Sequence, residues 1–122
     1  MAWRSTLYKE EDMKQLFSLR GRATRLQWWT IWLVIVLLGP LVDMIVAKDD
    51  VPAWIAVWGV ACVAVMLWIG LAANVRRWHD INRSGWMSLV FLVPLLGPLI
   101  VLLYNGCIPG DASDNRYGAP AL

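Results

Sequence analysis

The sequence predicts an all-α membrane protein, in which a short amphipathic surface helix precedes three membrane helices in a single domain. Three observations support this prediction: the composition, a series of long apolar runs, and the positions of the tryptophans. Hydrophobic residues make up 59% of the 122 residues and charged residues only 16%, whereas an ordinary soluble domain is about one-quarter charged. A soluble chain this short could not hide so much apolar surface in one core, so the excess indicates a bilayer as its solvent.

Three apolar segments are long enough to cross a bilayer, namely residues 28–47, 51–73 and 86–104. A helix of about 20 residues, rising about 1.5 Å per residue, spans roughly 30 Å, the thickness of the hydrocarbon layer. Thr24 and Gln27 form a capping-box pattern that opens the first segment. Gly39 and Pro40 are expected to bend this segment near its far end.

The third segment is interrupted at Pro94–Pro98, and two interpretations remain open. It is either a spanning helix kinked at Pro94, or a re-entrant hairpin that turns back at Gly97 and Pro98. Broken backbone in the middle of the bilayer needs cover from the other helices.

The two ends of the chain have different patterns. Met13, Leu16 and Phe17 follow helical spacing, which predicts a surface helix over about residues 8–20 that stops at Gly21. A solvated tail without structure is the alternative. At the other end, residues 105–122 are rich in Gly, Pro, Asn and Asp and predict a coil.

Six of the nine tryptophans lie at or near the ends of apolar runs, where indole rings favour the membrane interface: Trp28, Trp29, Trp32, Trp54, Trp78 and Trp86. The two cysteines, Cys62 and Cys107, are expected at different depths, so no disulfide is predicted. The net charge of +2 is too small to indicate a nucleic-acid partner.

A polar island between the second and third segments is the strongest candidate site and is predicted to be a loop at the membrane surface. Its nine candidate residues form a structural or interaction cluster: Arg76, Arg77, Trp78, His79, Asp80, Arg83, Ser84, Gly85 and Trp86. Within it, Asp80 is expected to pair with Arg76, Arg77 or Arg83. The neighbouring His79 and Asp80 could also suggest a base or a metal site. However, His79 is the only histidine in the chain, so no catalytic residue, metal or cofactor is predicted.

The distribution of Lys and Arg predicts the orientation in the membrane. With three crossings, nine of these residues lie on the side of the N-terminus and the island, against two on the side of Lys48 and the tail. Cytoplasmic regions carry the excess, so the N-terminus is predicted to be cytoplasmic and the tail external. A hairpin would bring the tail inside and change the count to ten against one. Contact with anionic lipid is expected from six arginines: Arg20, Arg22, Arg25, Arg76, Arg77 and Arg83.

The chain resembles the domain-of-unknown-function family 805 in six motifs that occur in the same order. They are Leu19 to Arg22; Arg25 with Trp28 and Trp29; Arg76 to Asp80; Arg83 to Trp86; Pro94 to Gly97; and Asn115 to Gly118. This chain has Trp78 and Leu19 where the family typically has Leu and Phe. The resemblance implies a small multi-pass protein of the bacterial inner membrane, and it implies no activity.

The tail motif of Asn115, Arg116, Tyr117 and Gly118 has a compact turn-like sequence. If it docks against the polar island, the tail must be cytoplasmic and the third segment must be a hairpin or two half-helices. This remains a hypothesis at the level of the sequence.

The sequence favours a non-enzymatic accessory or assembly subunit, whose partners are membrane lipid and other membrane proteins or copies of itself. The alternative is a small oligomeric channel or transporter that uses Asp43 or the broken third segment, because ionisable residues inside membranes are often functional. A membrane enzyme that uses His79 and Asp80 is a third interpretation.

Overall fold

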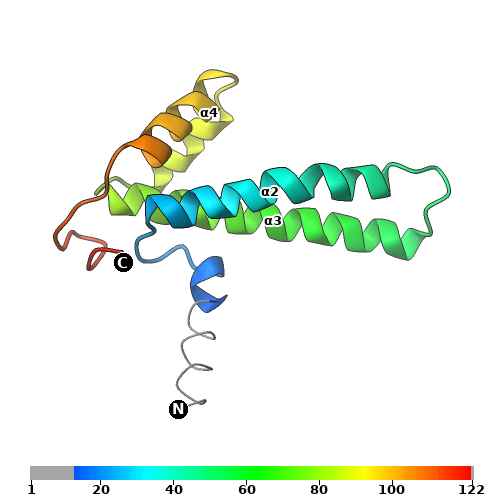
Figure 1. Cartoon of the computed structure of the whole chain (residues 1–122), viewed down its shortest axis with the longest axis horizontal. Coiled ribbons are helices and arrows are strands. Elements are labelled where there is room, and N and C mark those ends of the chain that lie inside the picture. Colours follow the sequence, from blue (N-terminus) through cyan, green and yellow to red (C-terminus); the bar gives the residue numbers. More distant parts are fainter. Residues whose placement is uncertain (1–12, 122) are drawn as a thin grey trace, which may run out of the picture.

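The computed structural model describes residues 13–121, and every regular element in that range is a helix (Figure 1). The predicted all-helical class is therefore confirmed for this part of the chain. Among the described helices, only α2 and α3 are long and apolar enough to cross a membrane. In chain order the elements are residues 13–17, α2 (Arg25–Val46), α3 (Ala53–Asp80), η1 (Gly85–Leu92), α4 (Leu96–Val101) and the π-helix η2 (Leu102–Cys107).

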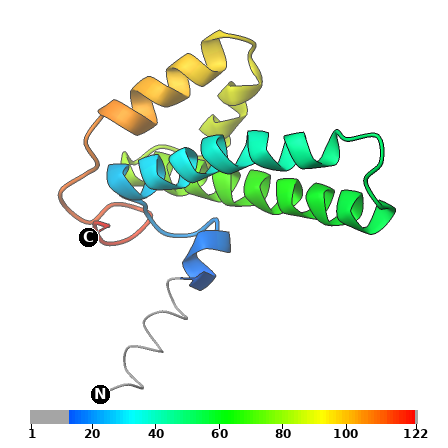
Figure 2. The ribbon, with the colours of Figure 1, turned by 45° about the vertical axis from the view of Figure 1, so that its right-hand side comes forward.

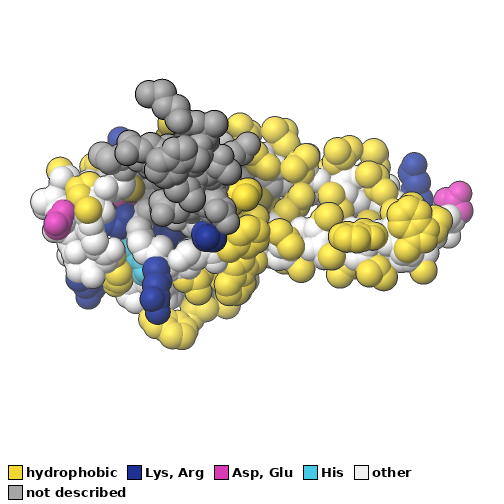
Figure 3. Space-filling view, turned by 90° about the horizontal axis from the view of Figure 1, so that it is seen from below, with side chains coloured by type: hydrophobic (Ala, Val, Ile, Leu, Met, Phe, Trp, Pro, Cys, Tyr) yellow, Lys and Arg dark blue, Asp and Glu magenta, His cyan; other side chains and the backbone are white. Residues whose placement is uncertain are grey.

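Two helical hairpins of unequal length make up the architecture. Helices α2 and α3 form the long hairpin, and η1 with α4 forms a shorter one beside the start of α2 (Figures 1 and 2). The chain then returns to the end of the molecule where α2 begins and α3 ends. On the face shown in Figure 3, charged side chains gather at the two ends of the long hairpin, with hydrophobic side chains between them.

The start of α2 is fixed by the predicted capping box. The Thr24 hydroxyl accepts a hydrogen bond from the Gln27 backbone N–H at 3.1 Å, and the Gln27 side chain accepts one from the Thr24 backbone N–H at 3.0 Å. Two of the N–H groups that a helix start leaves unpaired are thus satisfied. Pro40 lies inside α2, which continues to Val46.

Helix α3 is longer than the sequence predicted and includes most of the polar island. It extends through Asp80, so Arg76 to Asp80 lie on its last turns rather than in a loop. Asn82 stops the helix in the left-handed conformation, with φ of 55°. The Asn82 N–H donates to the His79 carbonyl at 3.0 Å and the Arg83 N–H to the Trp78 carbonyl at 2.8 Å. These two bonds form a Schellman C-cap with asparagine in the position usually taken by glycine.

Two glycines of α3 let α2 approach closely. A Cβ atom added at Gly59 would lie 2.2 Å from Val46 Cγ2, and one added at Gly70 would lie 3.1 Å from Ile35 Cδ1. By contrast, Ala61 is exposed and, at 100° per residue, lies on the opposite side of α3. Ala64 is also exposed but borders a groove that α3 shares with α2.

The third apolar segment is not one kinked helix, because η1 and α4 fold back on each other through a turn at residues 93–95. Leu95 adopts a φ of 64°, which reverses the chain, and Pro94 has no N–H with which to continue a helix. The returning helix, residues 96–107, is about 18 Å long at ~1.5 Å per residue, roughly half of what a crossing requires. Of the two interpretations from the sequence, the hairpin agrees with the structure, but it turns at residues 93–95 and not at Gly97 and Pro98, which lie within α4.

The ends of the chain also differ from their predicted bounds. Residues 13–17 are helical, so the predicted surface helix ends before Gly21, and its residues 8–12 lie outside the described part. The Trp68 indole N–H donates to the Phe17 carbonyl at 3.0 Å and ties this helix to α3. The predicted coil begins later than expected, because Asn105 to Cys107 belong to η2.

Replacing Gly97 by alanine is expected to destabilise the short hairpin. The added Cβ would lie 2.1 Å from the Val90 carbonyl oxygen, and backbone atoms cannot move aside as a flexible side chain can. We expect Gly97→Ala to lower the free energy of unfolding by about 1–3 kcal/mol, typical of overpacking. The measurement is unfolding in detergent by titration with sodium dodecyl sulfate.

Gly39→Ala is the matched control, because a Cβ there meets nothing within 4 Å. It should leave stability unchanged or raise it slightly. Equal loss of stability in both variants would contradict the close approach of η1 and α4.

Candidate functional site

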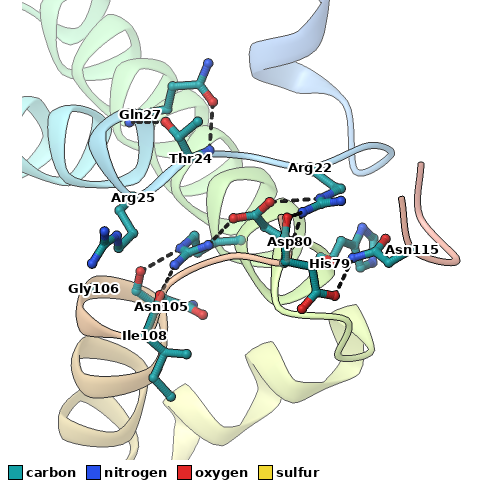
Figure 4. A network of polar contacts seen from close by, with 12 residues as sticks. Arg22, Thr24, Arg25, Gln27, His79, Asp80, Asn105, Gly106, Ile108 and Asn115 are labelled. Atoms are coloured by element: carbon teal, nitrogen blue, oxygen red, sulfur yellow. Dashed lines mark hydrogen bonds and ion pairs between the residues drawn. The ribbon is translucent and has the colours of Figure 1, made fainter. Parts of the chain in front are cut away.

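The carboxylate of Asp80 lies between two buried arginines at the end of α3 (Figure 4). Arg22 Nε donates to Asp80 Oδ1 at 2.8 Å, and Arg77 Nη1 donates to Asp80 Oδ2. The side chains of both arginines are at most 1% exposed and that of Asp80 is 8% exposed. Both carboxylate oxygens therefore accept charge-assisted hydrogen bonds away from solvent.

The remaining donors of Arg77 bind the end of the short hairpin. Its Nε donates to the Asn105 carbonyl at 2.7 Å, and its Nη2 donates to the carbonyl of Ile108. Both carbonyls lie at the C-terminal end of η2, where a helix leaves its last carbonyls without intrahelical partners. Arg77 therefore caps η2 and joins it to α3.

Arg22 binds the tail in the same way from the opposite side of Asp80. Its Nη1 donates to the Ser113 carbonyl at 2.9 Å and to the Gly118 carbonyl at 3.3 Å, and its Nη2 donates to the carbonyl of Asp111. We call Arg22, Arg77 and Asp80 the ionic cluster. This cluster joins four parts of the chain: the linker before α2, the end of α3, the end of η2 and the tail.

The tail crosses the ionic cluster at a glycine. A Cβ added at Gly110 would lie 1.9 Å from Asp80 Oδ2, so any larger residue would collide with the carboxylate. The next residue, Asp111, donates its backbone N–H to the Asp80 carbonyl at 2.8 Å. Asp80 thus holds the tail with its backbone and the arginines with its side chain.

The tail motif docks on the last turn of α3 and the residues that follow it. A small turn, closed by a bridge between Asn115 and Gly118, directs Asn115 Nδ2 to the His79 carbonyl at 2.9 Å. The Tyr117 ring stacks on the His79 imidazole, with centroids 3.8 Å apart and planes 9° from parallel. Arg116 Nη2 donates to the Asn82 carbonyl at 3.1 Å. The tail therefore lies on the side of the N-terminal linker, and not on the opposite side as the count of three crossings predicted.

His79 is held as a structural group in the polar last turn of α3, beyond the helix's apolar stretch. Partial burial lowers the pKa of His79, and the nearby positive charge of Arg116 acts in the same direction, although the hydrogen bond with Gly21 opposes them. Its Nδ1 lies 3.1 Å from the Gly21 carbonyl oxygen. In the neutral ring, Nδ1 is then the protonated nitrogen that donates to Gly21.

One of the three arginines expected to pair with Asp80 does so, namely Arg77. Arg76 is buried and its Nε donates to the Ala72 carbonyl at 3.3 Å, while Arg83 is exposed. The second partner, Arg22, was not expected, because it precedes Asp80 by 58 residues. No pattern in the sequence connects the two.

The structure corrects the expected set of lipid-contacting arginines. Arg22, Arg76 and Arg77 are buried inside the protein, so their guanidinium groups are not available to head groups. The other members, Arg20, Arg25 and Arg83, are exposed.

Two tryptophans expected at the membrane interface are instead in the core. Trp28 is 3% exposed and Trp78 is fully buried. Trp28 Nε1 donates to the side-chain oxygen of the buried Asn74 at 2.7 Å, and Trp32 Nε1 donates to the same oxygen at 3.3 Å. Asn74 therefore orients both rings between α2 and α3, a role that its position inside a helix did not indicate. The exposed members of the expected set include Trp29, Trp54 and Trp86.

Other predicted residues lie apart from the ionic cluster. Asp43 is exposed on α2, one turn before its end at the 47–52 turn. Ser84 caps η1, with its hydroxyl 3.4 Å from the Trp86 backbone N–H. Both cysteines are exposed and unbridged. Within residues 13–121, no group of three or more His, Cys, Asp or Glu side chains is placed to hold a metal ion.

Fold and site together define a small helical protein with two helices long enough to span a membrane and a short hairpin closed by a buried ionic cluster. The chain belongs to the family described as protein of unknown function (DUF805), whose model matches residues 16–119. The resemblance found in the six motifs is thus confirmed.

Three relatives from Escherichia coli K12 show how similar the chain is to other members. It is 31% identical over 111 residues to the inner membrane protein YhaH, covering 87% of this chain and 88% of the relative. It is 31% identical over 108 residues to the inner membrane protein YhaI, covering 87% of each. The uncharacterized protein YiiR is 30% identical, covering 84% of this chain and 85% of the relative. No solved structure matches this chain.

Asp80→Asn is expected to destabilise the protein strongly, because it leaves Arg22 and Arg77 buried without a negative charge. Breaking a buried ion pair by removing one partner costs about 3–5 kcal/mol. We expect a loss of this size in unfolding experiments in detergent, together with faster proteolysis of the tail after Cys107.

Asp43→Asn serves as the control, because it removes the same charge from an exposed position. It should leave both stability and proteolysis unchanged. A stable Asp80→Asn variant with a protected tail would contradict the central role of the ionic cluster.

Proposed function

We propose that the protein is a multi-pass inner membrane protein in which α2 and α3 cross the bilayer and the short hairpin enters it from the cytoplasmic side. The lengths and apolar composition of α2 and α3 support this placement, as do the inner membrane relatives. The hairpin's returning helix is too short to cross, and Arg77 of α3 binds a carbonyl at its C-terminal end. Both ends of the chain are then on one side of the membrane.

Charge supports the cytoplasmic assignment of that side. Lys48, in the turn between α2 and α3, is the only Lys or Arg between Arg25 and Arg76. The other ten lie before or at the start of α2, on the last turns of α3, or after α3. Positive residues near the ends of short membrane segments stay in the cytoplasm, so both termini are cytoplasmic in the proposed topology.

Reporter fusions test this topology. Green fluorescent protein fused after Leu122 should fluoresce, and alkaline phosphatase at the same place should be inactive. Alkaline phosphatase inserted at Asp49, in the turn between α2 and α3, should be active, because that turn is periplasmic in the proposed topology. Active phosphatase after Leu122 would contradict the proposal.

We further propose that the protein is a non-enzymatic accessory or assembly subunit that binds other membrane proteins. The observation that carries this proposal is how the polar groups are used: both Asp80 oxygens bind arginines, and the His79 ring is stacked on Tyr117 and bonded to Gly21. The groups best suited to chemistry therefore hold the fold together. In contrast, no residue in the most apolar window of α2 is buried, so the long hairpin offers much apolar surface to neighbours.

The back of α3 is the face best suited to a partner helix. Ala61 lies there, exposed and away from α2, and Ala64 is exposed at the edge of the groove that α3 shares with α2. Without a hydrophobic driving force between helices in lipid, association depends on close van der Waals packing, which small side chains permit.

Photo-crosslinking in native membranes tests this role. Benzoylphenylalanine at Ala61 or Ala64 should give a discrete adduct with another membrane protein, whereas the same group at Leu37, exposed on α2, should give none. An adduct only at twice the 13.8 kDa chain mass would contradict the accessory role and favour an oligomeric channel. Equal diffuse labelling at all three positions would contradict a defined partner face.

A further inference from the structure

An apolar groove runs between α2 and the short hairpin. Its volume is about 330 Å³, within the range of pockets that hold small ligands. Every residue that lines it is apolar. One wall comes from α2 and the other from η1, α4 and η2, which diverge from α2 toward the hairpin tip (Figure 2). The principal lining residues are Trp28, Trp29, Leu33, Val36, Phe91 and Leu102.

The indole N–H groups of the two tryptophans nearest the start of α2 are hydrogen-bonded to other parts of the protein, and these bonds hold the rings in place. Trp29 Nε1 donates to the Gly106 carbonyl at 3.2 Å, and Trp28 Nε1 donates to Asn74. A Cβ at Gly106 would lie 2.7 Å from Trp29 Cζ2, so only glycine lets the ring lie against η2. With their N–H groups satisfied, the rings offer carbon surface to the groove, which is therefore preformed.

A positive charge stands where the two walls meet. Arg25 is exposed at the first position of α2, one turn before Trp28 and Trp29. Its Nη1 donates to the carbonyl of Cys107, the last residue of η2, at 3.2 Å. Arg25 retains donors that this single bond does not use. It also lies at the N-terminal end of α2, where the helix dipole favours anions.

The dimensions of the groove match one leaflet of a bilayer. From Arg25 to Val36 the helix rises about 17 Å, at ~1.5 Å per residue. Half of the hydrocarbon layer measures about 15 Å. An anionic group bound at Arg25 would therefore lie at the boundary of the hydrocarbon layer, with the groove below it extending to the bilayer centre.

We propose that this groove is a binding site for one phospholipid of the cytoplasmic leaflet, with an acyl chain between α2 and the short hairpin and the phosphate on Arg25. The inference rests on the membrane placement proposed above and is independent of any protein partner. Water is a poor occupant because the lining offers it no hydrogen-bond partners. A partner helix, about 10 Å wide with its side chains, needs more room than a groove of about 330 Å³ offers.

Lipid binding to the purified protein tests the site. The protein is delipidated in an uncharged detergent and titrated with phosphatidylglycerol, and binding is followed by native mass spectrometry. We expect one tightly bound lipid per chain. Diacylglycerol with the same acyl chains should bind about tenfold more weakly or worse, because it lacks the phosphate that forms charge-assisted hydrogen bonds.

Paired variants separate the two parts of the site. Leu33→Trp or Val36→Trp should fill the groove and abolish binding, whereas Val34→Trp, on another exposed face of α2, should not. Arg25→Gln should weaken phosphatidylglycerol binding about tenfold and leave diacylglycerol binding unchanged. Arg25→Lys, which keeps the charge, should retain most of the affinity. Arg83→Gln controls for the loss of an exposed arginine.

Three results would overturn the proposal. They are equal binding of phosphatidylglycerol and diacylglycerol, equal loss in Arg25→Gln and Arg83→Gln, or a groove-filling variant that changes the oligomeric state and leaves lipid binding intact. Unfolding measured in the same detergent checks that each variant is folded. Failure of the crosslinking experiment would leave these outcomes unaffected, so the two proposals are tested separately.

Discussion

The structure depends on one constraint, which is that two buried guanidinium groups share one carboxylate. Arg22 and Arg77 carry two positive charges and Asp80 only one negative charge, and burying an unbalanced charge is costly unless hydrogen bonds compensate for it. The compensation comes from backbone carbonyls at Asn105, Asp111 and Ser113. Carbonyls at a helix end and in a tail are available because no helix uses them. The buried arginines therefore depend on the carbonyls of η2 and the tail, and these segments are in turn held in place by the arginines.

That requirement explains why the third apolar segment turns back. A helix that crossed the bilayer would carry the end of η2 and the tail about 30 Å from Arg22 and Arg77. The buried arginines would then lose the carbonyls that solvate them, and His79 would lose the stacked Tyr117 ring. Pro94 and the left-handed Leu95 provide the turn, but the ionic cluster determines where the chain must finish.

Local sequence patterns predicted the long helices. The ionic cluster could not be predicted, because its residues pair over long distances in the sequence. The capping box at Thr24 and the two long apolar helices could be read directly, because each depends on residues close in sequence. The polar island looked like a solvated loop, since Arg76 and Arg77 in succession usually face water. Arg77 is buried against Asp80 and the Asn105 carbonyl, which is 28 residues away, and the second partner of Asp80, Arg22, is 58 residues from it. Only the turn-like tail motif suggested that the tail docks on the polar island. Such docking requires the third segment to turn back as a hairpin or as two half-helices.

The half-length hairpin and the apolar groove have the same origin. A third helix that crossed beside α2 could pack along its whole length, whereas the short hairpin diverges from α2 toward its tip, although Phe91 near that tip still stacks on Trp32. The ionic cluster fixes the base of the hairpin through Arg77, and the contact of Trp29 with Gly106 sets the spacing between α2 and η2 there. Farther from the base, the apolar groove opens between α2 and the hairpin. The ionic cluster thus does more than close the fold, because by holding the base of the hairpin against α2 it leaves beside Arg25 the apolar groove that we propose as a lipid site.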